Sequence, residues 1–204
     1  MDLSKPIDTA HWLACSPAEH ERASRFRFER DARRYRAAHA TMRQLLSGAL
    51  HQAAADLQWR VDEHGKPQLT GHPGWHFNLS HSADWALLAL SHGAAVGVDL
   101  ECCEAITDTK SLMTQHFTAG ERATWDAAPQ RERTALFYRI WSRKEACLKA
   151  AGCGLSTPPH LLDVGGEPQA RLVQVPTQNA HLQVTVQSLP LPVQAMAAVA
   201  IVQG

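Results

Sequence analysis

The order of helical and extended segments limits the fold more than any other feature of this sequence. Residues 17–50 are predicted to be helical, because Ser16 and Pro17 form a typical helix start and an alanine- and arginine-rich stretch follows them. Short apolar runs between turn residues then predict extended segments at residues 75–79, 85–90 and 97–101. The first half of the chain therefore runs from helix to strands.

The second half repeats this order. A long helix is predicted over residues 132–151, and it ends at a glycine-rich stop. Valine- and leucine-rich runs, broken by glycine and proline, predict three antiparallel strands between residues 161 and 202. We therefore expect an α+β fold of two similar lobes related by a pseudo-twofold axis, residues 1–103 and 104–204, each a helix packed on a small antiparallel sheet. Ligands tend to bind where such units meet, so the active site is expected in the cleft between the lobes.

The composition argues against several classes of protein. The 204 residues hold 20 Lys plus Arg and 20 Asp plus Glu, whereas nucleic-acid-binding domains are usually basic. No apolar run approaches the roughly 18 residues of a membrane span, and the N-terminus does not look like a secretory signal. Five cysteines without a C-x-x-C pair disfavour a disulfide framework and a zinc site. We expect a cytoplasmic protein that binds neither nucleic acid nor membrane.

A basic stretch lies within the first predicted helical region. Eight arginines fall between residues 22 and 43, with few acids among them. Two interpretations stay open: these arginines form the solvated face of a helix, or they form an anion-binding surface.

A pair of carboxylates follows an apolar run near the middle of the chain. Asp99 and Glu101 are two residues apart on a predicted strand, so their side chains point to the same face. Neighbouring carboxylates repel each other unless a cation lies between them, and Mg²⁺ typically binds one or two carboxylates together with substrate phosphates and water. Most such pairs are solvated surface, but the apolar residues around this one favour a magnesium site.

A further acidic position lies on the long predicted helix. Trp141, Glu145 and Lys149 are spaced four residues apart and therefore form one stripe. The simplest interpretation is an aromatic residue beside a surface Glu–Lys pair. In the functional interpretation, Glu145 completes a metal shell or accepts a proton, and Lys149 balances phosphate charge.

Two polar turns are candidates for phosphate binding. Ser80 and His81 are adjacent in the segment Phe-Asn-Leu-Ser-His-Ser, and adjacent residues cannot easily face each other as nucleophile and base. We interpret this segment as a phosphate-binding turn that follows a strand. Lys66 and Pro67 likewise present a cation on a tight turn, which taken alone is only a hairpin.

Taken together and in order, these segments resemble those of one family. They are G-K-P at residues 65–67, F-N-x-S-H-S at 77–82, G-V-D-L-E at 97–101 and W-S-x-K-E-A-x-x-K-x-x-G-x-G-L at 141–155. The set is similar to that of the 4′-phosphopantetheinyl transferases, in particular the larger, two-lobed surfactin-synthetase type. The resemblance covers residues 20–160.

The resemblance implies a reaction and a set of residue roles. Coenzyme A would donate its 4′-phosphopantetheine group to a serine of an apo acyl or peptidyl carrier protein, with Mg²⁺ as cofactor and adenosine 3′,5′-bisphosphate as the leaving product. Asp99, Glu101 and Glu145 would hold Mg²⁺. Glu145 and Lys149 would be catalytic; a carboxylate would accept the serine proton directly or through water, and Glu145 is the first candidate for this base, whose identity the resemblance leaves open. Glu121 matches an acid that the family has near the metal. The residues implied to contact coenzyme A are Arg22, Arg34, Lys66, Pro67, Ser80, His81 and Lys149.

Other implications are less local. Arg22 and the pair Arg33 and Arg34 would lie near the 3′-phosphate of coenzyme A. A monomer is expected, because one chain of this length holds both lobes. An acidic carrier protein is expected to dock on an apolar and basic strip near residues 113–117 or 139–143. Two alternatives remain: a Mg²⁺-dependent nucleotide diphosphate hydrolase, and a non-catalytic module that binds carrier proteins.

Overall fold

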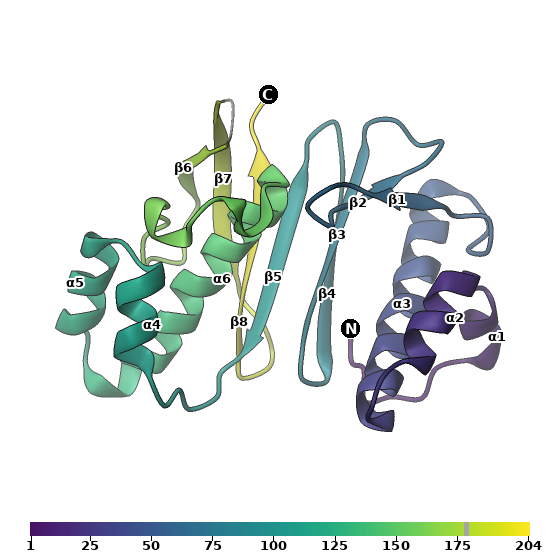
Figure 1. Ribbon diagram of the computed structural model, residues 1–204, viewed down its shortest axis with the longest axis horizontal. Coiled ribbons are helices and arrows are strands. Elements are labelled where there is room, and N and C mark those ends of the chain that lie inside the picture. The colour runs from purple at the N-terminus through teal and green to yellow at the C-terminus, as the bar shows by residue number, and fades with distance from the viewer. Residues whose placement is uncertain (178–179) are drawn as a thin grey trace.

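The computed structural model describes residues 1–177 and 180–204 and has two lobes built of helices and small antiparallel sheets (Figure 1). The first lobe comprises α1 (Thr9–Leu13), α2 (Pro17–Ser24), α3 (Glu29–Leu50), β1 (Trp59–Val61), β2 (Pro67–Leu69), β3 (Trp75–Ser82) and β4 (Trp85–His92). The second comprises β5 (Val96–Cys102), α4 (Thr109–His116), α5 (Ala119–Ala127), α6 (Arg133–Ala151), β6 (Arg171–Pro176), β7 (His181–Leu189) and β8 (Ala195–Val202). Single 3₁₀ turns occur at Gln130–Glu132, Gly154–Ser156 and Pro159–Leu161. The predicted α+β architecture is confirmed.

A buried ion pair fixes α2 on α3. Ser16 and Glu19 form a capping box that starts α2. Glu19 also accepts hydrogen bonds from Arg43 Nε at 2.8 Å and pairs with His39 Nδ1 at 2.8 Å, and both partners lie on α3. Arg43 is 2% exposed and donates to the carbonyl groups of Ala54 and Leu57. At least this arginine of the basic stretch is therefore part of the core rather than of a surface.

The hairpin of β3 and β4 is longer than predicted. The two strands pair antiparallel from Trp75↔His92 to Ser82↔Trp85, so Ser80 and His81 lie within β3. The predicted polar turn at these residues is wrong; the chain turns at Ala83 and Asp84 instead. Polar residues occur inside this strand because one of its faces meets β5, as described below.

The second lobe is built around α6. Its sheet has the strand order β5-β8-β7-β6, and α6 packs against β5, β8 and β7. Apolar side chains from α6, including Ile140 and Leu148, form one core with Val184 and Val186 of β7. β5 lies before the expected lobe boundary between residues 103 and 104, but it hydrogen-bonds to β8 of the second lobe.

Gly97 allows α6 to approach β5 very closely. A Cβ atom at this position would lie 2.2 Å from the carbonyl oxygen of Ala146 and 2.3 Å from the backbone nitrogen of Ala150. Backbone atoms of a helix cannot move aside as a flexible side chain can, so only glycine fits. This close contact brings Lys149 of α6 beside Asp99 of β5.

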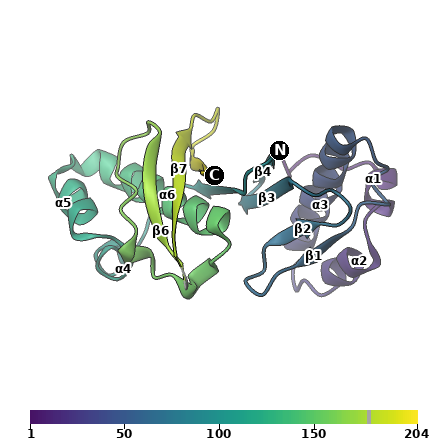
Figure 2. The ribbon, with the colours of Figure 1, turned by 90° about the horizontal axis from the view of Figure 1, so that it is seen from above.

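Side chains join β3 to β5 where the lobes meet. The two strands belong to different sheets but lie next to each other, and β3 and β4 lie between the bodies of the two lobes (Figures 1 and 2). Alternate polar residues of β3 accept hydrogen bonds from backbone N–H groups of β5: Asn78 from Val98 at 2.8 Å, Ser80 from Leu100 at 3.3 Å, and Ser82 from Cys102 at 3.1 Å. We call Asn78, Ser80 and Ser82 the seam residues. Among the described residues, no helix is both long and apolar enough to cross a membrane.

Candidate active site

A cavity of about 630 Å³ lies where the two lobes meet. Helices α2 and α3, the β1–β2 turn and β3 line it from the first lobe, and α6 lines it from the second. Its size suits a nucleotide-sized ligand. Six of the predicted site residues line it, namely Arg22, Lys66, Pro67, His81, Glu145 and Lys149.

A second cavity, of about 470 Å³, adjoins the first. It shares His81, Glu145 and Lys149 with the larger cavity. It is also lined by Ser80, Asp99, Glu101, His116 and Trp141. The structure therefore brings all three predicted metal ligands to one cavity, next to the predicted coenzyme A contacts.

Lys149 and Asp99 form the closest charged contact of the site. The Nζ of Lys149 lies 2.6 Å from Asp99 Oδ1 and 3.3 Å from the hydroxyl of Ser80. Ser80 also donates to Asp99 Oδ1 at 3.0 Å. Ser80, predicted as a nucleotide contact, is buried at the seam and holds the carboxylate and the lysine in place. It lines the second cavity, which we call the carboxylate cavity, and not the larger one.

The carboxylates carry more negative charge than the protein compensates. Burial raises the pKa of Glu101 above its ordinary value, and the nearby charge of Asp99 raises it further. Burial likewise raises the pKa of Glu145, and Asp99 contributes, although Lys149 opposes the shift. Raised pKa values mean that the ionised carboxylates are unfavourable where they lie, so a bound cation would stabilise their ionised form.

Asp99 itself supports the same conclusion. Its side chain is 5% exposed, and its Oδ2 is the one buried side-chain oxygen or nitrogen of the described residues that has no hydrogen-bond partner. A buried oxygen without a partner costs about 1–3 kcal/mol or more, unless a ligand satisfies it. In the part of the chain that the structure describes, no group of three or more His, Cys, Asp or Glu side chains is placed to hold a metal ion, and Asp99, Glu101 and Glu145 do not form such a group by themselves. The three carboxylates that line the cavity would therefore bind Mg²⁺ only together with oxygens of the substrate phosphates or of water, which is how Mg²⁺ is usually held on phosphate substrates.

Trp141 forms the wall of the carboxylate cavity on α6. It lies one turn before Glu145, as the predicted stripe requires, and its ring stacks on Phe137 at 6.4 Å between centroids and on Phe117 at 6.3 Å. The aromatic cluster behind it belongs to the core of the second lobe. This packing fixes the middle of α6 against the core of the second lobe.

Lys66 reaches across the lobes. Its Nζ donates to the carbonyl oxygen of Ala150, at the C-terminal end of α6, at 2.6 Å. Burial lowers the pKa of Lys66 to about 8. A phosphate in the cavity would favour the charged form of this lysine, so its position fits the predicted role.

His81 lies at the junction of the two cavities. Desolvation by the surrounding protein lowers the pKa of its imidazole, and the positive charges of His39 and Lys149 lower it further, although solvent still reaches the ring. A low pKa among cations again indicates a place where an anion would bind.

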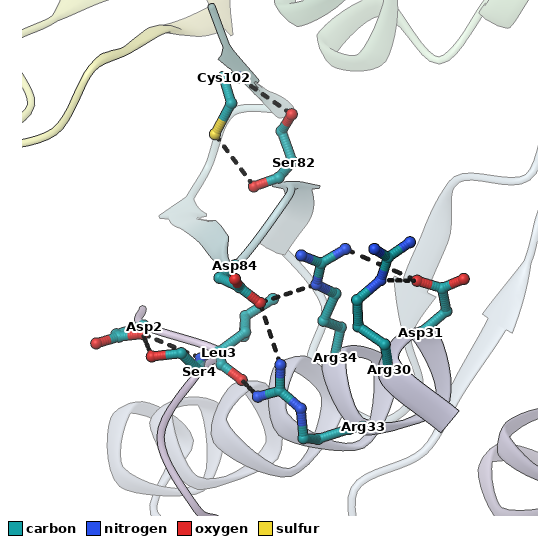
Figure 3. Close-up of polar contacts among 10 residues, drawn as sticks. All are labelled: Asp2, Leu3, Ser4, Arg30, Asp31, Arg33, Arg34, Ser82, Asp84 and Cys102. Carbon is teal, nitrogen blue, oxygen red and sulfur yellow. Dashed lines mark hydrogen bonds and ion pairs between the residues drawn. The ribbon is translucent and has the colours of Figure 1, made fainter. Parts of the chain in front are cut away.

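The arginines predicted to contact coenzyme A lie in two different places. Arg22 lines the larger cavity, with its guanidinium 5.7 Å from the ring centre of Tyr35. Arg34 lines neither cavity: its Nε donates to Asp84 Oδ1 at 2.8 Å, and Arg33 donates to the same oxygen at 3.2 Å (Figure 3). The structure thus places Arg34 at the β3–β4 turn, where it fixes the hairpin to α3.

Two further expectations do not agree with the geometry. Glu121 is 2% exposed, pairs with the buried Lys144 at 2.7 Å and accepts from the backbone of Val164, so it is a structural acid of the second lobe. The suggested docking strips are also partly internal: Met113, Phe117 and Arg143 are all buried. Sequence alone did not reveal these contacts because each partner is distant along the chain.

The seam residues were missed as a group. Ser80 was interpreted as a ligand contact, and Asn78 and Ser82 received no role. A signal was present: polar residues at positions 78, 80 and 82 alternate with other residues on one strand, which places them on the same face. Nothing in the sequence around Gly97, beyond the motif G-V-D-L-E, indicates the close approach of α6.

Family models match both halves of the chain. The model of the 4′-phosphopantetheinyl transferase superfamily matches residues 95–199, and the model described as 4′-phosphopantetheinyl transferase, N-terminal, matches residues 7–93. The two matches together span both lobes and meet just before β5.

Individual relatives show the same likeness. The 4′-phosphopantetheinyl transferase HetI of Nostoc sp. is 32% identical over 186 residues, which are 89% of this chain and 75% of HetI. The 4′-phosphopantetheinyl transferase Sfp of Bacillus subtilis is 32% identical over 143 residues, 70% of this chain and 62% of Sfp. The L-aminoadipate-semialdehyde dehydrogenase-phosphopantetheinyl transferase of Xenopus laevis is 34% identical, over 72% of this chain and 53% of that protein. This chain, whose fold and motifs agree with these matches, belongs to the 4′-phosphopantetheinyl transferase superfamily and to its two-lobed Sfp type.

Proposed function

We propose that this 4′-phosphopantetheinyl transferase moves the phosphopantetheine group of coenzyme A onto a serine hydroxyl of an apo acyl or peptidyl carrier protein, with Mg²⁺ held by Asp99, Glu101 and Glu145. The observation that supports it best is the pair of adjoining cavities. The larger one offers cations and aromatic side chains to a nucleotide, and the smaller one offers carboxylates to a cation. A diphosphate at their junction would lie within reach of both.

The residues of this chain would divide the work. Arg22 and Lys66 would bind the nucleotide end of coenzyme A in the larger cavity, and His81 would contact its phosphates. Lys149 would stabilise the charge that grows on the phosphate oxygens in the transition state. Glu145 would accept the proton of the attacking serine, directly or through water, with a carboxylate oxygen that does not bind Mg²⁺.

The metal has one function here. Mg²⁺ bound by the three carboxylates would neutralise the diphosphate and the leaving bisphosphate. The attacking serine comes from the carrier protein, so a nucleophilic serine or cysteine is not required in this chain.

The carrier protein would dock beside Trp141. A hollow of about 380 Å³ lies there, lined by Leu112, Phe137 and Tyr138 among others, and it shares Trp141 with the carboxylate cavity. An apolar side chain of the carrier placed in this hollow would bring its serine toward the reacting phosphate. This hollow replaces the partly buried strips that the sequence suggested.

The test is incubation with coenzyme A, Mg²⁺ and a panel of apo carrier proteins, followed by intact-mass measurement. We expect at least one carrier to gain the mass of one phosphopantetheinyl group, and the gain to disappear with Asp99→Ala. A purified Asp99→Ala variant that keeps near-normal turnover would show that the metal assignment is wrong. A panel without any mass gain would count against the transferase function itself.

A further inference from the structure

The seam residues accept hydrogen bonds from backbone N–H groups of β5 that would otherwise lack a partner. On the side facing the first lobe, β5 has no neighbouring strand in its own sheet, because it is the edge of the order β5-β8-β7-β6. Its N–H groups at residues 98, 100 and 102 are therefore bonded by side chains of β3. Buried backbone donors require such partners, so the seam is part of the link between the lobes.

In Ser80 and in Ser82, the hydroxyl that accepts from the backbone of β5 also donates a hydrogen bond to a carboxylate of the site. Ser80 donates to Asp99 Oδ1 at 3.0 Å. One step along both strands, Ser82 donates to Glu101 Oε2 at 3.3 Å. The repeat is regular: residues two apart on β3 meet residues two apart on β5.

The chemistry of a hydroxyl makes this contact directional. A serine has one O–H to donate and lone pairs that accept. The backbone N–H of Cys102 occupies a lone pair of Ser82, which leaves the single O–H to donate to Glu101. The carboxylate is thus held by a group whose own orientation is set by the backbone of its strand.

Ser82 is joined to both lobes. Its carbonyl oxygen accepts from the thiol of Cys102 on β5 at 3.4 Å, and Asp84, two residues further along the chain, pairs with Arg33 and Arg34 of α3 (Figure 3). The main chain of Ser82 therefore follows α3, whereas Glu101 belongs to the second lobe's sheet.

We infer that Ser82 is a positioning residue, which holds Glu101 in the orientation needed to bind Mg²⁺ and so makes metal affinity depend on the joint between the lobes. The inference rests on the proposed metal role of Glu101. It deepens that role, because it assigns part of the metal affinity to a side chain that would not touch the metal.

The test compares Ser82→Thr with Ser82→Val. The two side chains have nearly the same size and both suit a strand, but only threonine has the hydroxyl. Coenzyme A binding is measured by calorimetry at a series of Mg²⁺ concentrations, which needs no carrier protein. We expect Ser82→Val to need about fivefold more Mg²⁺ for its half-maximal effect, the change that the loss of one ordinary hydrogen bond produces. Ser82→Thr should match the unmodified protein.

Ser91→Val is the matched control. Ser91 lies on β4, donates to the carbonyl oxygen of Ala94 and lines neither cavity. It should leave the Mg²⁺ dependence unchanged. If Ser82→Val is poorly folded by thermal unfolding, Ser82→Ala provides a second variant without the hydroxyl.

The outcomes separate this inference from the proposed function. A hydroxyl-free variant that responds to Mg²⁺ like the unmodified protein, while transfer to a carrier proceeds, overturns the positioning role and leaves the function intact. An equal shift in Ser91→Val, or in Ser82→Thr, also overturns it, because the effect would then come from packing. If coenzyme A binding to the unmodified protein does not depend on the Mg²⁺ concentration, the proposed metal site and this inference are both overturned.

Discussion

At the scale of single residues, Lys149 and Arg22 should affect catalysis in opposite ways. Lys149 lies 2.6 Å from Asp99 at the junction of the cavities, where charge would grow during the reaction. We expect Lys149→Ala to lower kcat by about 10²–10³-fold with a smaller effect on coenzyme A binding. Arg22 lines the larger cavity only, so Arg22→Ala should raise the KM for coenzyme A by about tenfold and change kcat little.

Steady-state kinetics check both variants. Lys5→Ala is the control, since Lys5 is largely exposed and pairs with Asp2 away from both cavities. The reverse pattern, with Arg22→Ala lowering kcat and Lys149→Ala raising KM, would mean that the two roles are exchanged.

Glu19 should make stability depend on acidic pH. Burial opposes its ionisation, but hydrogen bonds from His39 and Ser16 and the charge of Arg43 outweigh it and lower its pKa from 4.5 to about 2. Because the folded pKa is below the unfolded one, the stabilisation is fully present above pH 4.5 and is lost as the pH falls toward 2. We expect a loss of on the order of 3 kcal/mol over this range.

Denaturant unfolding at several pH values measures this loss. Glu19→Gln should be less stable at neutral pH, since it leaves Arg43 buried without its partner, and it should lack most of the acid slope. Glu29→Gln, which removes an exposed acid from the start of α3, should unfold like the unmodified protein. An unchanged slope in Glu19→Gln would place the acid sensitivity elsewhere.

At the scale of elements, the contact of β5 with α6 gives the clearest prediction. A Cβ at residue 97 would lie 2.2 Å from a backbone oxygen of α6, so Gly97→Ala must push the helix away from the strand. We expect a loss of about 3 kcal/mol in the free energy of unfolding and a large loss of activity, because Lys149 would leave Asp99. Gly48→Ala is the control: Gly48 is an exposed position of α3, a Cβ there would meet nothing within 4 Å, and the substitution should stabilise by up to about 1 kcal/mol. If Gly97→Ala were as stable as Gly48→Ala, α6 could move away from β5 at little cost, which would contradict the prediction.

Contacts between neighbours in sequence were predictable, whereas contacts between distant segments were not. The helix start at Ser16 and Pro17, the end of α6 at Gly152 and the stripe from Trp141 to Lys149 depend on neighbours in sequence, so they were predictable. The extension of β3 through Ser80 was not, because its polar face is stabilised by β5, about twenty residues further along the chain. The role of Glu121 was not predictable for a similar reason. Its partner Lys144 lies on a different helix, and this pairing makes an acid that resembles a metal ligand a buried structural residue.

At the scale of the whole molecule, we expect a monomer. Both walls of the larger cavity come from one chain, with Arg22 and Lys66 on one side and Glu145 on the other. Activity per chain should therefore stay constant on dilution while light scattering reports the mass of one chain. Activity that falls together with the loss of a dimer would contradict the proposal that one chain forms a complete site.

The central claim is that the attacking group is a carrier serine and not water. Release of adenosine 3′,5′-bisphosphate from coenzyme A, measured with and without an accepted apo carrier protein at saturating Mg²⁺, tests it most directly. The account predicts one bisphosphate for each phosphopantetheinyl group found on the carrier by intact mass, and almost none without the carrier. Equal release in the absence of the carrier, with the carrier mass unchanged, would contradict it and identify a Mg²⁺-dependent diphosphate hydrolase instead.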